Sequence, residues 1–129
     1  MMRRTAAMAL LALAACTVRA QAPDSLRIVT GFAPGGATDR VARIVGEKLQ
    51  AKLGTTVIVE NKTGAGGRLA AQQVRASRPG DNVLMVGNPA VMVVAPLVFK
   101  DNGYDAERDF VPVSHVNDYE FGTKSRSAS

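Results

Sequence analysis

The stretch IVTGFAPGGATD, residues 28–39, decides the predicted fold. It opens with a short apolar run, turns at a proline followed by two glycines, and enters an amphipathic segment near Thr38. A short, nearly continuous apolar run is typical of a strand buried on both faces, and proline cannot continue a central strand. We therefore expect a strand over residues 26–32, then a tight loop, then a helix that is capped by Thr38 or Ala37.

The expected helix continues to a stop at Gly54, which is a residue that favours helix ends. Its apolar residues recur at helical spacing and predict one buried stripe. The stripe consists of Val41, Ile44, Val45, Leu49 and Leu53.

The same alternation then repeats along the chain. We expect strands over residues 56–60 and 83–86, with a helix over residues 68–76 between them. Residues 90–99 contain valines that suit a strand, but Pro89 and the position after a strand favour a short helix. Alternating strands and helices indicate an α/β fold, a parallel-rich sheet with flanking helices.

Two further segments follow these elements. Residues 104–110 are expected to cross the surface irregularly, and residues 111–116 are a candidate short strand.

The first twenty residues have the features of a secretory signal peptide. Arg3 and Arg4 precede an uncharged run that is too short to span a bilayer. Cleavage after Ala20 is expected, although residues 13–16 also fit a lipoprotein box that would place a lipid on Cys16. These features predict a periplasmic protein whose mature part has 109 residues, enough for one small domain.

The charge pattern argues against nucleic acid as a partner. Three of the 16 basic residues lie in the leader, which leaves 13 against 11 acidic residues, a net charge of +2. No long basic run or aromatic-rich basic patch is present. Nucleic-acid binding is therefore not expected.

Catalytic and cofactor patterns are equally weak. The first glycine loop lacks the lysine of a phosphate-binding P-loop, and Leu69 stands where a dinucleotide fingerprint needs glycine. His115 is the only histidine, and the mature part has no cysteine, so no zinc site is expected. Asp39 could act as a general base, but stabilising the helix start is the favoured interpretation. No enzyme activity, metal or cofactor is predicted.

Glycine-rich loops follow all three predicted strands. They cover residues 31–39, residues 61–67, and the pair Gly87 and Asn88. In open parallel sheets ligands bind at the carboxyl ends of the strands, and free amides at helix starts suit a carboxylate or a phosphate. The alternative is that the glycines only make tight turns.

Three stretches together resemble the Bug-type extracytoplasmic solute receptors of tripartite tricarboxylate transporters. They are residues 28–39, residues 57–67 (VIVENKTGAGG) and residues 104–114 (YDAERDFVPVS), within a resemblance that covers about residues 24–117. The resemblance implies the first lobe of a periplasmic binding protein-like (type II), two-lobed fold. It also implies a small organic carboxylate or acidic amino acid as ligand, and membrane transporter subunits as partners.

The resemblance further implies that the ligand is bound through loop amides and hydroxyl groups. The candidate ligand-binding residues are Phe32, Pro34, Gly35, Gly36, Thr38 and Asp39 in loop one, Gly64, Ala65, Gly66 and Gly67 in loop two, and Gly87 and Asn88 in loop three. Thr63 and Pro89 depart from the family pattern, which leaves the ligand preference open.

The length departs from the family, whose members are on the order of two domains long. We expect residues 21–117 to form the first lobe, residues 118–129 to be a polar tail, and the second lobe to be missing. This predicts a truncated receptor fragment that binds ligand weakly or not at all by itself. The alternatives are an exported α/β enzyme or an interaction domain that uses the same loops.

Overall fold

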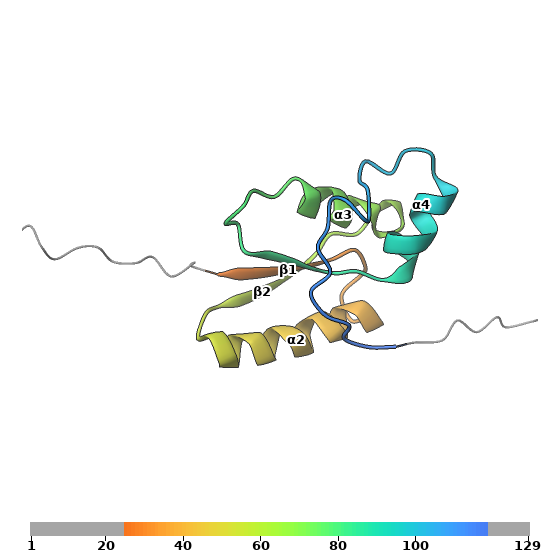
Figure 1. Ribbon diagram of the computed structural model, residues 1–129. Helices are drawn as coiled ribbons and strands as arrows, with labels where there is room; N and C mark the ends of the chain where they lie inside the picture. Colours follow the sequence, from red (N-terminus) through yellow and green to blue (C-terminus); the bar gives the residue numbers. More distant parts are fainter. Residues whose placement is uncertain (1–24, 119–129) are drawn as a thin grey trace, which may run out of the picture.

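A computed structural model describes residues 25–118. The expected signal peptide, Cys16 and most of the polar tail lie outside the described residues. A three-stranded sheet forms the centre, with helix α2 (Ala37–Leu53) on one face and helices α3 (Arg68–Arg75) and α4 (Ala95–Val98) on the other (Figure 1). No helix of the described part is long and apolar enough to cross a membrane.

The sheet has the order β2-β1-β3, and both pairings are parallel. Its strands are β1 (Leu26–Thr30), β2 (Val57–Asn61) and β3 (Val83–Val86). The central strand contributes the fully buried Ile28 and Val29 because it is covered on both faces. The predicted α/β alternation is confirmed, although β1 ends two residues earlier than expected.

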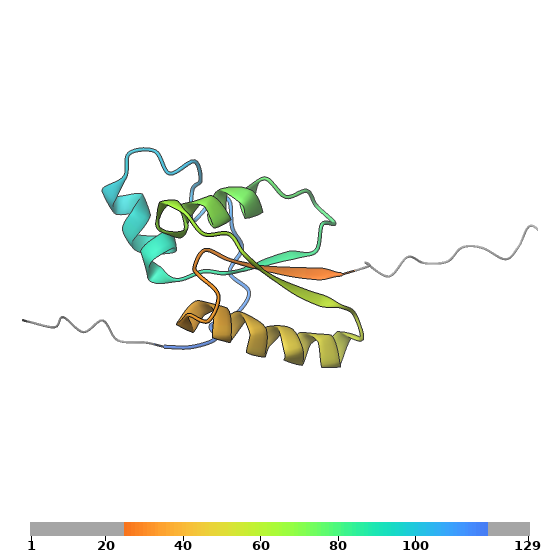
Figure 2. The same cartoon turned by 180° about the vertical axis from the view of Figure 1, so that it is seen from behind.

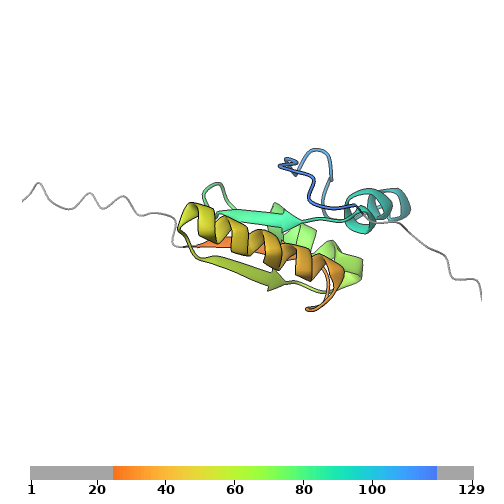
Figure 3. The ribbon, with the colours of Figure 1, turned by 90° about the horizontal axis from the view of Figure 1, so that it is seen from below.

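Helix α2 lies over the sheet, roughly along the strands (Figure 3). Its buried face uses small residues: Ala42 is fully buried, and Gly46 lets Ile28 and β2 approach closely. Because the helix packs on these small residues, the predicted apolar stripe is partly wrong, and Ile44 and Leu53 are exposed.

The two ends of α2 differ in how well the sequence predicted them. The helix ends as expected, at Gly54, which has the left-handed φ of 64°. The predicted cap by Thr38 or Ala37 is wrong, because Gly36 occupies the N-cap position without a side-chain cap.

Short helical segments follow β2 and β3. A 3₁₀ turn, η1 (Ala65–Gly67), leads into α3, and a π-helical turn, η2 (Ala90–Val94), leads into α4. The helical interpretation of residues 90–99 is therefore confirmed, and their strand alternative is wrong. Viewed from behind, the loops after all three strands lead toward the α4 end of the molecule (Figure 2).

The segment after α4 is anchored more deeply than the sequence suggested. Tyr104 is buried, packs edge-on against Phe110 and belongs to a cluster with Ala71 and Val91. Residues 104–110 are irregular, as expected, but they do more than cross the surface. The candidate strand at residues 111–116 does not form: Val111 and Val113 are more than three-quarters exposed, and Pro112 has no N–H to donate to a ladder.

Candidate functional site

The three glycine-rich loops meet at one edge of the sheet. A Cβ atom on Gly31 would lie 2.7 Å from the Gly67 Cα, so loops one and two are in backbone contact. A Cβ on Gly67 would in turn lie 2.7 Å from Val91, just after loop three, and 3.2 Å from Phe32. The predicted convergence of the loops at the carboxyl ends of the strands is therefore confirmed.

Asp39 holds loop one in shape. Its carboxylate accepts hydrogen bonds from the Arg43 Nε, the Gly35 amide and the Asn61 side chain, each at 2.9 Å. Asn61 also donates to the Phe32 carbonyl, so one side-chain pair connects loop one, α2 and the end of β2.

The environment of Asp39 keeps it ionised. The hydrogen bond from Arg43, together with those from Gly35 and Asn61, holds the pKa of the Asp39 carboxyl far below its usual range. Only 2% of the residue is exposed. A buried carboxylate with three donors is a positioning group, and its pairing with Arg43 leaves no net negative charge beside the helix start.

The free donors of loop one are at the start of α2. Gly35 and Gly36 use their amides inside the loop, the first for Asp39 and the second for the Ala33 carbonyl. The amides of Ala37 and Thr38 and the Thr38 hydroxyl have no partner among residues 25–118. Sequence reasoning named Thr38 but missed Ala37, which its place in the first helical turn could have indicated.

Loop two has an unusual backbone. Gly64, Ala65, Gly66 and Gly67 all have positive φ, and Gly67 donates to the Gly64 carbonyl at 2.9 Å. Gly67 is buried beneath Phe32 and Val91, whereas Ala65 and Gly66 are exposed at the start of η1. Of the four predicted residues in this loop, only Gly67 is thus buried, and Gly64 is exposed like Ala65 and Gly66.

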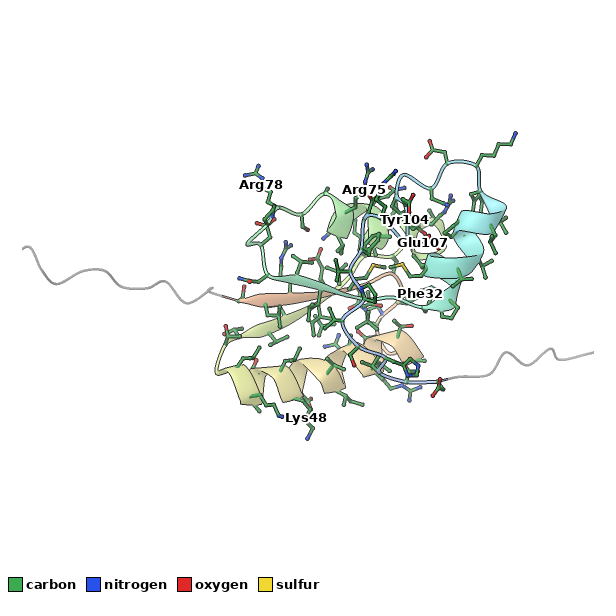
Figure 4. All side chains as sticks on the ribbon, viewed as in Figure 1. Phe32, Lys48, Arg75, Arg78, Tyr104 and Glu107 are labelled. Carbon is green, nitrogen blue, oxygen red and sulfur yellow. The ribbon has the colours of Figure 1, made fainter. Side chains whose placement is uncertain are left out.

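Several other predicted residues have structural partners. Phe32 packs against the cluster of Ala71, Val91 and Tyr104, and Figure 4 places it beside the base of α4. The Asn88 side chain accepts a hydrogen bond from the Val91 amide at 3.1 Å, near the start of η2. Beside it Gly87 is exposed, as is Pro34 in loop one.

Two hollows lie on the α4 side of the sheet. The smaller, about 270 Å³, is lined by Ala65 and Gly66 and by the apolar side chains of η2 and α4. The larger, about 720 Å³, lies between α4 and residues 99–109 and touches none of the predicted site residues. Its charged groups largely pair with one another, as Arg75 does with Asp109. The smaller hollow is therefore the one that belongs to the loops.

The described residues offer no metal centre. No group of three His, Cys, Asp or Glu among residues 25–118 is placed to hold an ion. His115 is exposed, and its Nε2 lies 3.2 Å from the Asp118 carboxylate.

Comparison with known families gives a clear match. Residues 41–129 match the family described as the tripartite tricarboxylate transporter family receptor. A UPF0065 protein of Bordetella bronchiseptica is 41% identical over 109 residues, which is 83% of this chain and 32% of that protein. Protein BugT of Bordetella pertussis is 33% identical over 94 residues, 72% of this chain and 29% of that protein. The chain thus spans about a third of the length of these relatives.

Solved structures agree with this match. MatC of Rhodopseudomonas palustris, which has bound malate, is 36% identical with a TM-score of 0.68, over 71% of this chain and 31% of that one. The periplasmic binding protein BugD is 37% identical with a TM-score of 0.60, over 67% and 28%. A third protein, from R. palustris with adipate, is 28% identical with a TM-score of 0.61, over 64% and 27%. The predicted periplasmic binding protein-like fold is confirmed.

Proposed function

The chain belongs to the tripartite tricarboxylate transporter receptor family, and from this membership we propose that it captures a small organic carboxylate outside the cytoplasmic membrane. The observation that carries the proposal is that the amides of Ala37 and Thr38, at the start of a 17-residue helix, have no partner in the part of the chain that the structure describes. A helix start with free amides favours an anion. The names of two related structures, with malate and with adipate, support carboxylate as the chemical class.

We propose that this edge of the sheet supplies backbone and hydroxyl donors for one carboxylate group. Ala37 and Thr38 would donate from α2, with Ala65 and Gly66 beside them. Asp39 and Asn61 hold the loop and do not touch the ligand. An open site shares its donors with water, which weakens each contact. We expect binding by this chain alone to be weak, with a Kd of about 1 mM or above.

The proposed partners and location follow from the family. A receptor of this kind would deliver its ligand to membrane transporter subunits. Export would depend on residues 1–20, with release at Gln21 or lipid attachment at Cys16 as the two expected outcomes. Mass measurement of the mature chain distinguishes them, and an unprocessed Met1 in the periplasmic fraction would contradict export by this leader.

Backbone amides can be followed one by one in solution, which suits a weak site. We would titrate the ¹⁵N-labelled chain with malate, adipate and inorganic phosphate and record amide chemical shifts. The proposal predicts shifts at Ala37, Thr38, Ala65 and Gly66 with the two acids. No shift up to about 50 mM, far above the expected Kd, or shifts only around residues 99–109, would overturn it. A response to phosphate alone would favour the enzyme alternative, which turnover of a phosphate ester would then test.

A further inference from the structure

The two borders of the sheet differ in how well their backbone groups are covered. At the β2 border the Val57 amide, which faces away from β1, donates to the Gln50 side chain at 3.1 Å. Glu60 adds a charge to the same strand and pairs with Arg27. Covered backbone groups and charged side chains protect a sheet edge against further strands. The other border is β3, teal in Figure 3, and its four residues are all apolar.

The β3 border has free backbone groups. The Arg27 amide donates to the Asn82 carbonyl, so in this parallel register Leu84 is the next residue that bonds to β1. Its two neighbours, Val83 and Met85, therefore turn their amides and carbonyls outward. Within residues 25–118 these outward groups have no hydrogen-bond partner. Such an edge is a template for another strand.

Residues 111–116 have the sequence of a strand and no neighbouring strand. Val111, Val113 and Val116 are β-branched and more than half exposed, and the whole segment is irregular. The chain after residue 110 runs across the sheet toward the α2 side rather than alongside β3 (Figure 1 and Figure 2). The segment therefore does not cover the β3 border of its own chain.

Pro112 determines which residues of the segment are able to pair. Proline fits an edge strand only where its missing N–H would face away from the neighbouring strand. In an antiparallel ladder, the more stable kind per residue, one residue turns both its N–H and its C=O to the neighbour and the next turns both away. The residues that face a partner are therefore Val111, Val113 and His115, whereas Pro112 and Ser114 face away.

This pairing also matches the side chains of the two segments. Met85 packs against the buried cluster around Tyr104, on the α3 side of the sheet. Residues directly opposite each other in a ladder place their side chains on the same face. Val113 opposite either Val83 or Met85 would thus cover apolar surface on the α3 side. The segment and the border are complementary in both backbone groups and side chains.

We propose that the β3 border is an interaction surface for a second copy of this chain, and that residues 111–116 of each copy pair antiparallel with β3 of the other. Each copy carries one free border and one unpaired segment, so two copies related by a twofold axis satisfy both. Each sheet then gains a fourth strand. The inference goes beyond the proposed function and does not depend on it.

Two proline substitutions, one residue apart, test the pairing. Val113→Pro removes an N–H that faces the partner, and the matched control Ser114→Pro removes one that faces away. Both positions are exposed, and neither amide has a partner in the described part of the chain, so the fold of one copy does not depend on them. Sedimentation of the full chain across the µM to mM range gives the dimer Kd, and NMR follows hydrogen exchange at the Val83 and Met85 amides. Mixing ¹³C-labelled with unlabelled chains shows whether contacts between residues 111–116 and β3 join two molecules.

We expect exchange at Val83 and Met85 to slow at least about tenfold as the dimer forms, because hydrogen-bonded amides are protected. Val113→Pro should remove this protection and raise the dimer Kd at least about tenfold, whereas Ser114→Pro should change it less than about twofold. Equal effects of the two prolines, or fast exchange at both amides in an associated sample, overturn the inference. A chain that stays monomeric overturns it as well. So does protection that is independent of concentration, since the segment would then pair with β3 of its own chain.

Discussion

Asp39 lies in the first turn of α2 and connects three segments through a single carboxylate. An ionised group that gains hydrogen bonds on folding has a lower pKa in the folded than in the unfolded chain. Its stabilising effect is therefore fully present above the unfolded value, about 3.9, and is lost as the pH falls toward the lower folded value. Loop one itself should keep its shape through this window, because Asp39 stays ionised in the folded chain until the pH reaches the lower folded value.

We predict that the unfolding temperature of the chain drops as the pH falls below about 4 and that Asp39→Asn flattens this drop. At pH 7 Asp39→Asn should unfold more than about 5 °C lower, because a buried amide cannot replace a carboxylate toward Arg43. Thermal unfolding followed by circular dichroism at several pH values measures both effects.

The control is Asp118→Asn, whose side chain is 94% exposed. Asp105, whose pKa is lowered by the Arg108 and Glu107 amides, leaves some pH dependence in every variant. An Asp39→Asn curve parallel to that of the unaltered chain would contradict this account.

Gly31 is the second residue on which the loops depend, and its importance comes from close backbone approach. Gly31→Ala would place a methyl group 2.7 Å from the Gly67 Cα and 2.9 Å from its carbonyl oxygen. We predict a loss of about 1–3 kcal/mol in the free energy of unfolding, as for overpacked sites. In the matched variant Gly36→Ala the new atom meets only the Ala33 carbonyl, at 3.3 Å, so we expect less than about 0.5 kcal/mol. Urea denaturation compares the two, and equal losses would show that the contact between the loops is unimportant.

At the level of elements, the turn at η2 has a specific cause. The Ala95 amide bonds to the Ala90 carbonyl, a π-helical pattern. The next amide in that pattern would come from residue 96, which is proline and has no N–H. The Val91 carbonyl is therefore left without a helical partner, and the Tyr104 hydroxyl donates to it at 2.5 Å. One proline thus explains why residue 104 is buried.

This explanation predicts that two substitutions depend on each other. Tyr104→Phe should lower the free energy of unfolding by about 1–3 kcal/mol, because it leaves a buried carbonyl unsatisfied. In a Pro96→Ala background the new amide can bond to Val91, so the penalty should fall by at least about half. A double-mutant cycle from urea denaturation measures the coupling. Additive effects would mean that Tyr104 stabilises the fold by packing alone.

The elements also show where sequence reasoning succeeds. The three strands, α3 and the end of α2 at Gly54 carry strong local signals, which are apolar runs and a glycine with its own backbone preference. The start of α2 was misjudged because Asp39 acts through Gly35 and Asn61, and Asn61 is distant in sequence. The strand expected near Val111 needs a neighbouring strand, which no local pattern can supply.

The candidate site was predicted to a similar extent. The glycines correctly predicted that the three loops meet at one edge of the sheet, since the ends of parallel strands must lie together. The sequence could not tell which amides remain free, because that depends on every hydrogen bond inside the loops. The contact between Arg68 and Phe99 could not be predicted either, because only the fold brings these two side chains together.

On the scale of the whole molecule, apolar surface is unevenly distributed. Val93, Leu97 and Val98 on η2 and α4 are more than half exposed, and Val111 and Val113 add to the apolar surface after α4. Large exposed apolar patches favour association. We predict that the chain self-associates at concentrations of about 100 µM, within the range where exposed apolar surface drives association.

Substitution on this face should reduce the association. Val93→Ser combined with Leu97→Ser should shift sedimentation profiles toward the monomer. The control is Ile44→Ser, which removes a single exposed apolar side chain from α2. An unaltered chain that stays monomeric at high concentration would contradict the prediction.

The strand order determines when the sheet can form during synthesis of the chain. Among the strands of residues 25–118, β1 is the first to be synthesised, but it lies at the centre of the sheet, between partners that come later in the chain. Its pairing with β2 needs Val57, and its pairing with β3 is complete only once Val86 has been made. Such non-local pairing slows folding. Until then Ile28 and Val29 remain without cover on an emerging chain. The order β2-β1-β3 therefore gives this polypeptide an interval in which its central strand has been made and its sheet cannot yet close.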